Sequence, residues 1–100
     1  MYCVLLEFIP VPGKEEEFLK AWKELTAHIY SNYGSKGSRI HKSESGKFIA
    51  YAQWPDKGVY DNVTGDDEGA RLRENMMRFL QKNGIRVLEK LEVLEDLLEH

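Results

Sequence analysis

The sequence is poor in cysteine and has no long apolar run. Cys3 is the only cysteine among 100 residues, which excludes an internal disulfide and a multi-cysteine metal site. A lone cysteine is also typical of a reducing compartment. The N-terminus has no basic segment before an apolar stretch, and no apolar stretch reaches the length of a membrane span. We therefore expect a cytoplasmic protein with neither a signal peptide nor a membrane anchor.

Positive charge is not in excess either. The formal net charge is −3, which provides no general electrostatic attraction for nucleic acids or anionic lipids. The sequence also lacks a glycine-rich phosphate loop, a metal-ligand spacing of His, Cys and carboxylates, and the setting of a Ser-His-Asp triad. We expect no metal or other cofactor, no nucleic-acid partner and no membrane partner. These absences fit a cofactor-free enzyme and a non-catalytic binding protein equally well.

The length is that of a single domain, and no linker, internal repeat or low-complexity segment divides the chain. We assign residues 1–97 to this domain. Residues 98–100, Leu98-Glu99-His100, are either native or the remnant of a purification tag, which they resemble, and they carry no functional weight. A domain of this size has a small interior, so a ligand pocket must come from the main core or from contact with a second subunit.

The first half of the chain predicts a strand, a helix and two further strands. Residues 2–9 are apolar apart from Glu7, which is typical of a central strand buried on both faces. Residues 14–33 form a helix with carboxylates in its first turn, and Gly34 ends it. Its apolar face recurs every three or four residues: Phe18, Trp22, Leu25 and Ile29. Two strands follow at residues 38–44 and 47–54, the first polar and suited to a sheet edge.

The second half predicts a loop, a helix and a long strand. Residues 55–68 are acidic and contain glycine, as in a short helical turn followed by a loop. A second helix, capped by Thr64, Asp66 or Asp67, runs to about Asn83, where Asn83-Gly84 offers a left-handed stop. Residues 85–97 alternate as a strand does, although Leu, Glu and Lys also favour a helix there. The alternation places these residues on one face: Ile85, Val87, Glu89, Leu91, Val93, Glu95 and Leu97.

The order β-α-β-β-α-β predicts a ferredoxin-like α+β fold, an antiparallel sheet with two helices on one face. The other face would carry Leu, Ile, Val and Tyr side chains, an apolar patch too large for a monomer, so we expect a homodimer through the sheet. Glu7 would need a partner on that sheet, because an unpaired carboxylate is unfavourable in an apolar strand. The candidate partners are Arg39, Gln53, Arg86 and Lys90.

Two stretches resemble the antibiotic biosynthesis monooxygenase (ABM) family. One is the first strand leading into Pro-Gly-Lys-Glu-Glu-Glu-Phe, and the other is Ser-Gly-Lys-Phe-Ile-Ala-Tyr-Ala-Gln-Trp-Pro, in which Trp54 closes the third strand. The resemblance spans nearly the whole chain. It implies a dimeric α/β barrel, with a ligand cavity in each subunit between the sheet and its helices. Family members include enzymes that oxidise aromatic polyketide anthrones without metal or flavin, and haem-degrading enzymes.

The matched positions favour the cofactor-free chemistry. Haem-degrading members use an Asn on the first strand and a His on the second helix, whereas this chain has Leu5 and Glu7 near the first place and no His on the expected second helix. Haem ligation by that route is not expected. Trp54 and Tyr60 are spaced like the Trp and Tyr that some anthrone-oxidising members place in the pocket, but Ala50 lies where their accompanying Asn would be.

Four residues are candidates for catalysis: Trp54, Tyr60, Glu7 and His28. Trp54 and Tyr60 would line the pocket and stabilise an anionic aromatic oxygen, while Glu7 or His28 would help to move a proton. Each also has an ordinary structural explanation. Trp54 and Tyr60 suit packing, Glu7 suits an interface ion pair, and His28 suits the protein surface.

The sequence predicts an ABM-like monooxygenase that oxidises a small aromatic or polyketide-like compound with O2. The alternative is a non-catalytic dimeric module of the same fold that binds a small molecule or serves in stress. A closed apolar pocket of roughly a few hundred cubic ångströms would favour the enzyme. RNA binding on the sheet is a weaker third possibility, because Lys-Phe-Ile-Ala-Tyr-Ala only partly matches the RNA-recognition pattern and the chain is acidic.

Overall fold

The structure, a computed structural model, describes residues 1–98. Glu99 and His100, which belong to the expected tag remnant, lie outside the described residues. The elements follow the expected order, and the short helical turn expected within residues 55–68 is present after the third strand. They are β1 (Tyr2–Pro10), α1 (Glu15–Asn32), β2 (Gly37–Lys42), β3 (Phe48–Trp54), α2 (Lys57–Asp61), α3 (Asp67–Met77) and β4 (Leu80–Glu92).

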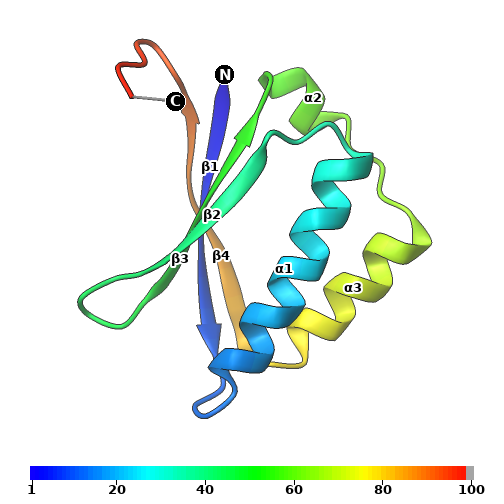
Figure 1. The fold of residues 1–100 in the computed structure, drawn as a ribbon, viewed down its shortest axis with the longest axis vertical. Helices are drawn as coiled ribbons and strands as arrows, with labels where there is room; N and C mark the ends of the chain where they lie inside the picture. Colours follow the sequence, from blue (N-terminus) through cyan, green and yellow to red (C-terminus); the bar gives the residue numbers. More distant parts are fainter. Residues whose placement is uncertain (99–100) are drawn as a thin grey trace.

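The strands form one antiparallel sheet in the order β2-β3-β1-β4. Helices α1 and α3 lie side by side on one face of this sheet (Figure 1). The predicted ferredoxin-like α+β fold is therefore confirmed, with β1 as a central strand and β2 at an edge. Cys3 and Glu7 are buried on the face opposite the helices, as expected for a strand covered on both sides.

The core lies between the sheet and the two long helices. Phe18 of α1 is completely buried, and its ring lies 5.2 Å from that of Phe8 and 5.9 Å from that of Phe48. Full burial of a side chain of this size stabilises a fold by about 1.5–3 kcal/mol. A second cluster at the far end of β1 contains Tyr2, Val4 and Trp54. This second cluster positions the site described below.

Helix α3 ends at Met77, so the prediction that it extends to about Asn83 is wrong. The chain leaves the helix early because Phe79 and Leu80 join the sheet. The N–H of Val11 donates to the carbonyl of Phe79 across 2.9 Å, and Leu80 pairs with Pro10 in the ladder. Asn83 does have a left-handed φ of 57°, but it lies inside β4, where the register against β1 shifts.

Strand β4 is confirmed as a strand, but it ends at Glu92 and contains an extra residue. Leu6 pairs with Val87 whereas its neighbour Leu5 pairs with Glu89, so Leu88 is unpaired in a β-bulge. Cross-strand partners share a face. Ile85 and Val87, before the bulge, therefore face the helices. Glu89 and Leu91, after it, face the opposite side, so the prediction of one continuous face over 85–97 is wrong.

Candidate functional site

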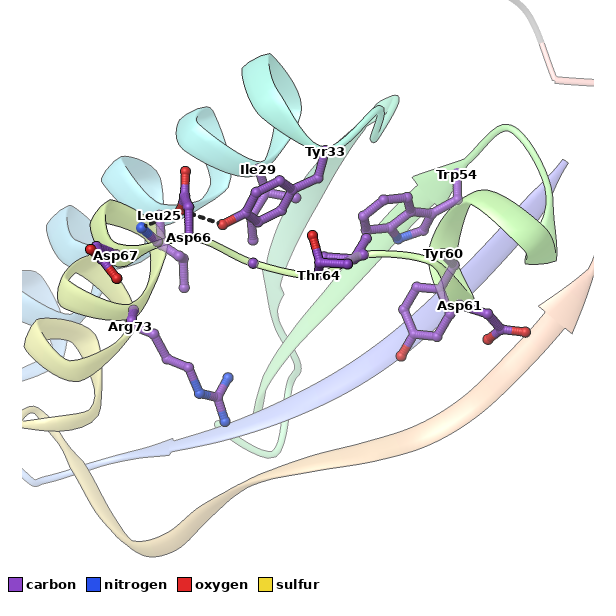
Figure 2. A pocket seen from close by; sticks show the side chains of 14 residues that line it. Leu25, Ile29, Tyr33, Trp54, Tyr60, Asp61, Thr64, Asp66, Asp67 and Arg73 are labelled. Atoms are coloured by element: carbon purple, nitrogen blue, oxygen red, sulfur yellow. Dashed lines mark hydrogen bonds between the residues drawn. The ribbon is translucent and has the colours of Figure 1, made fainter.

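An open cavity of about 820 Å³ lies between α1, α3 and the end of β3 (Figure 2). The segment 61–67 borders it and is exposed along its whole length. The volume falls within the range of about 300–1,000 Å³ that is usual for ligand sites. The cavity is larger than expected from the sequence, and it is open to solvent rather than closed.

Trp54 enters the cavity because it ends β3 on the helix-facing side, opposite Tyr2. Pro55 follows, and helix α2 turns the chain back: the Asp56 carboxylate accepts the N–H of Val59 across 2.8 Å and caps this helix. Tyr60 is thereby brought against Trp54, with ring centroids 5.4 Å apart and the rings edge to face. Such an arrangement is favourable for aromatic quadrupoles.

The ring of Tyr60 is held on its other sides by Tyr2 and Lys90. The centroids of the Tyr2 and Tyr60 rings are 5.5 Å apart. The Lys90 Nζ lies 5.4 Å from the centroid of the Tyr60 ring, a cation–π contact that stabilises by about 0.5–1 kcal/mol at an exposed site. Lys90 reaches this side of the sheet because it follows the bulge in β4 and pairs with Val4.

Several polar groups around the cavity have hydrogen-bonding capacity that the described chain leaves unused, and three of them are donors from Trp54, Tyr60 and Arg73. Within residues 1–98, no hydrogen bond or ion pair involves the Trp54 indole N–H, the Tyr60 hydroxyl or the Arg73 guanidinium. Trp54 is only 6% exposed, yet its nitrogen is not an enclosed unsatisfied atom. The cavity or solvent must therefore reach it. Figure 2 shows Arg73 extending from α3 alongside the same cavity.

A polar cluster closes the side of the cavity where α1 meets α3. This Asp66 cluster consists of His28, Tyr33, Asp66 and Gly69. The Tyr33 hydroxyl donates to Asp66 Oδ1 across 2.6 Å, and the Gly69 N–H donates to the same oxygen across 2.7 Å. His28 Nε2 lies 2.9 Å from Oδ1 and 3.0 Å from Oδ2. The cluster thus joins the C-terminal end of α1 to the N-terminus of α3.

The hydrogen bonds of the Asp66 cluster shift two pKa values in opposite directions. The bond from Tyr33, followed by those from His28 and the Gly69 N–H, lowers the pKa of Asp66 from 3.8 to about 2. The same bond to Asp66 raises the pKa of Tyr33. Both shifts have one physical cause, since a phenol O–H stabilises an adjacent carboxylate and the carboxylate opposes formation of a phenolate.

Asn32 indicates which nitrogen of His28 carries the proton. The Asn32 amide NH₂ donates to the backbone carbonyl of His28 across 2.9 Å, an acceptor that fixes the orientation of the amide. The same NH₂ lies 3.2 Å from His28 Nδ1, which therefore accepts. Nε2 is then the protonated nitrogen and donates to Asp66.

Solved structures resemble this chain, although no protein-family model and no curated protein matches its sequence. Rv0793 from Mycobacterium tuberculosis aligns with a TM-score of 0.74 at 14% identity, over 97% of this chain and 98% of that chain. The crystal structure of an antibiotic biosynthesis monooxygenase aligns with a TM-score of 0.73 at 15% identity, over 95% and 100%. The chain has the ABM fold.

A variant of SnoaB, a cofactor-independent oxygenase from Streptomyces nogalater, has the ABM fold as well. It aligns with a TM-score of 0.74 at 12% identity, over 98% of both chains. Identities this low show a common fold and leave function to be argued from the site. The fold predicted from the two sequence stretches is confirmed.

The ABM fold separates the four residues that the sequence analysis singled out. Trp54 and Tyr60 line the same cavity. His28 does not line it but contacts Asp66, which does. Glu7 lies on the opposite sheet face, where its carboxylate accepts from Arg86 Nε across 3.1 Å. Arg86 is one of the four partners expected for Glu7, and the structure does not bring Glu7 to the cavity.

Tyr33, Asp66 and Arg73 were not recognised as site residues from the sequence. Tyr33 was placed only at the end of the first predicted helix, and Asp66 was one of the residues expected to cap the second, which it does. The one available signal for Arg73 is its position four residues after Gly69, which places both on the same side of a helix.

Within residues 1–98, no three His, Cys, Asp or Glu side chains gather as metal ligands. No helix in the same range is long and apolar enough to cross a membrane.

Proposed function

We propose that this protein is an ABM-like monooxygenase that oxidises a small aromatic or polyketide-like compound with O2, without metal or flavin. The observation that carries the proposal is the cavity bordered by Trp54, Tyr60 and Arg73, whose donors are unused within residues 1–98. Aromatic walls with a few convergent polar groups are usual for sites that bind aromatic ligands. The fold shared with SnoaB, a cofactor-independent oxygenase, supports the same proposal.

The proposed reaction converts a ring methylene of an anthrone into a carbonyl. Loss of a methylene proton to solvent leaves an enolate, which gives an electron to O2. The resulting radicals combine into a carbon-bound hydroperoxide after protonation, and loss of water leaves the carbonyl. One CH₂ and one O2 thus become one C=O and one H₂O. The contribution of the protein is to hold the enolate oxygen near Arg73 and the Trp54 N–H.

The test is oxygen consumption by the metal-free protein with a panel of anthrone- and quinol-type compounds. We expect turnover, and we expect Trp54→Phe to reduce kcat/KM by about tenfold or more, because it removes a donor to an anionic oxygen. Trp22→Phe is the matched control, since Trp22 packs against the main core away from this cavity. Equal losses in both variants would contradict the assignment of the site.

The open cavity favours one alternative function. An oxygenase gains from excluding water from its reactive intermediate, whereas the cavity of this chain is bordered by the exposed segment 61–67. A binding module without turnover has no such requirement. Ligand binding in the cavity by a folded protein that consumes no oxygen with any compound of the panel would favour this alternative.

We also propose that a second copy of the chain covers the sheet face opposite α1 and α3, here called the outer face. Its residues are Arg39 and His41 of β2, Ile49, Tyr51 and Gln53 of β3, Cys3, Leu5 and Glu7 of β1, and Arg86, Glu89 and Leu91 of β4. Arg39 and Glu89 lie on opposite edge strands. If the two copies are related by a two-fold axis that runs parallel to the strands, β2 of each copy lies over β4 of the other. Arg39 of each copy then lies near Glu89 of the other copy.

Analytical ultracentrifugation tests this dimer. Leu91 is 38% exposed on the outer face, and we expect Leu91→Lys to shift the protein towards a monomer by placing a charge in the interface. Leu94 is 84% exposed beyond the end of β4, so Leu94→Lys is the matched control. A monomeric wild-type protein, or a Leu91→Lys variant that dimerises as the wild type does, would contradict the proposal.

A further inference from the structure

The Asp66 cluster fixes the direction of a hydroxyl group at the cavity wall. Tyr33 lines the cavity, and Figure 2 shows its hydroxyl turned towards Asp66. A phenol has one proton to donate and two lone pairs that accept. The proton is committed to Asp66, and within residues 1–98 no group donates to the Tyr33 oxygen. Tyr33 therefore offers an acceptor but no donor.

The geometry keeps Tyr33 in this state. A Cβ at position 69 would overlap the Tyr33 Oη and lie 2.7 Å from Asp66 Oδ1, so the hydroxyl and the carboxylate occupy space that only glycine leaves free. His28 lies within hydrogen-bond distance of both Asp66 oxygens and holds the plane of the carboxylate. The lowered pKa of Asp66 and the raised pKa of Tyr33 keep one group ionised and the other protonated at neutral pH.

We propose that Asp66, acting through Tyr33, makes the cavity selective for an aromatic ligand that carries a free hydroxyl group at its Tyr33 end. A ligand hydroxyl can donate to the Tyr33 oxygen, whereas an ether or a carbonyl at the same place has nothing to donate and finds no donor there. Asp66 is a positioning residue in this arrangement. The inference rests on the proposed function in one respect, namely that an aromatic ligand occupies this cavity.

The test compares two probes that differ in one group: 2-hydroxyanthraquinone and 2-methoxyanthraquinone. Binding is followed by quenching of tryptophan fluorescence. We expect the wild type to prefer the hydroxyl compound by about tenfold, the effect of one hydrogen bond that only the hydroxyl can make. Tyr33→Phe should reduce the ratio of affinities to about one, through a loss of affinity for the hydroxyl compound.

Asp66→Gly tests the positioning role separately. Glycine is tolerated at a helix N-cap, so α3 should be retained, but it offers no side-chain acceptor, which frees the phenol proton of Tyr33 to point into the cavity. We expect the ratio to fall to one or to invert in favour of the methoxy compound. Asp67→Gly is the matched control, because Asp67 also borders the cavity but makes no hydrogen bond to Tyr33.

The outcomes separate this inference from the proposed function. A wild-type ratio near one, a Tyr33→Phe variant that keeps the preference, or an equal loss in Asp67→Gly would overturn the role of Asp66. None of these results would contradict the proposed oxygenase function if the protein consumes oxygen with compounds of the anthrone panel. If the wild type binds neither probe and consumes no oxygen, both proposals fail. Circular dichroism of each variant verifies folding, and Asp66→Gly decides the matter if Tyr33→Phe does not fold.

Discussion

The polar groups on the two faces of the sheet differ in whether they have partners within residues 1–98. On the outer face, Glu7 is 5% exposed and its carboxylate accepts from Arg86. On the helix-facing side, the cavity brings together donors from Trp54 and Arg73 that no partner within residues 1–98 occupies. A buried charge that already has its partner is part of the fold, because removing the partner would leave it uncompensated. Donors left unused around a hollow are available to a ligand instead.

The strongest test of this difference is to substitute Arg73, whose guanidinium has no partner within residues 1–98. We expect Arg73→Met to lower kcat/KM for an anthrone by about a hundredfold, because a preorganised donor to a developing oxyanion contributes about 2.7–4 kcal/mol. Arg71→Met is the control, since Arg71 lies two positions away on α3 and pairs with Glu68. Steady-state oxygen uptake measures both. Similar rates in the Arg73 variant and the wild type would remove Arg73 from the site.

The outer-face pair should affect stability and spare the cavity. Arg86→Met leaves the buried Glu7 without its partner, and we expect a loss of about 1–3 kcal/mol in the free energy of unfolding. Glu7→Gln leaves Arg86, whose side chain is 60% exposed and remains hydrated, so we expect a smaller loss. Urea denaturation gives both values. If both variants lose catalytic efficiency at unchanged stability, the distinction between the faces is wrong.

Glycine 69 offers a steric test of the Asp66 cluster. We expect Gly69→Ala to destabilise the protein by about 1–3 kcal/mol, as overpacking usually does, because the new Cβ meets the Tyr33 hydroxyl. In a Tyr33→Phe background that oxygen is absent and the same substitution should be less harmful. A double-mutant cycle in urea reports the coupling. Strictly additive effects would show that Gly69 is needed for another reason.

The pH dependence of Asp66 is the most modest expected effect. Its pKa in the folded protein is about 2, below the ordinary 3.8, so its ionised form contributes stability above pH 3.8 that is lost as the pH falls through about 2. The wild type should therefore exceed Asp66→Asn in urea midpoint at pH 6, and the gap should narrow towards pH 2. A constant gap over this range would show that the charge of Asp66 is immaterial.

The fold was predictable because its signals are local. The apolar run at residues 2–9 and the strand-ending Trp54 gave the correct central strand and the correct end of β3. The end of α3 was missed because Phe79 and Leu80 continue the helical spacing of the buried residues Leu72 and Met76, although they lead into and begin β4. Burial in the same core imposes apolar residues on a helix and on a following strand alike.

The candidate site was predictable only in part. Trp54 and Tyr60 are close in sequence and joined by α2, and the resemblance of their spacing to that of some ABM members placed them together. Tyr33 and Asp66 are brought together by the packing of α1 against α3, a long-range contact with no local pattern. Glu7 was recognised as a residue that needs a partner, but the choice of Arg86 depends on strand register, which the sequence does not display.

Because Leu88 is unpaired, the positions of β4 that face the helices differ before and after it. Before it, Ile85 faces the packed core, and after it Leu91 faces the surface proposed to meet another copy. Deletion of one residue there would exchange these roles for every following position, turning Lys90 away from Tyr60 and moving Glu89 to the helix side. The length of β4 should accordingly vary less among related chains than the identity of its exposed residues, since a substitution alters one contact and a deletion alters both faces at once.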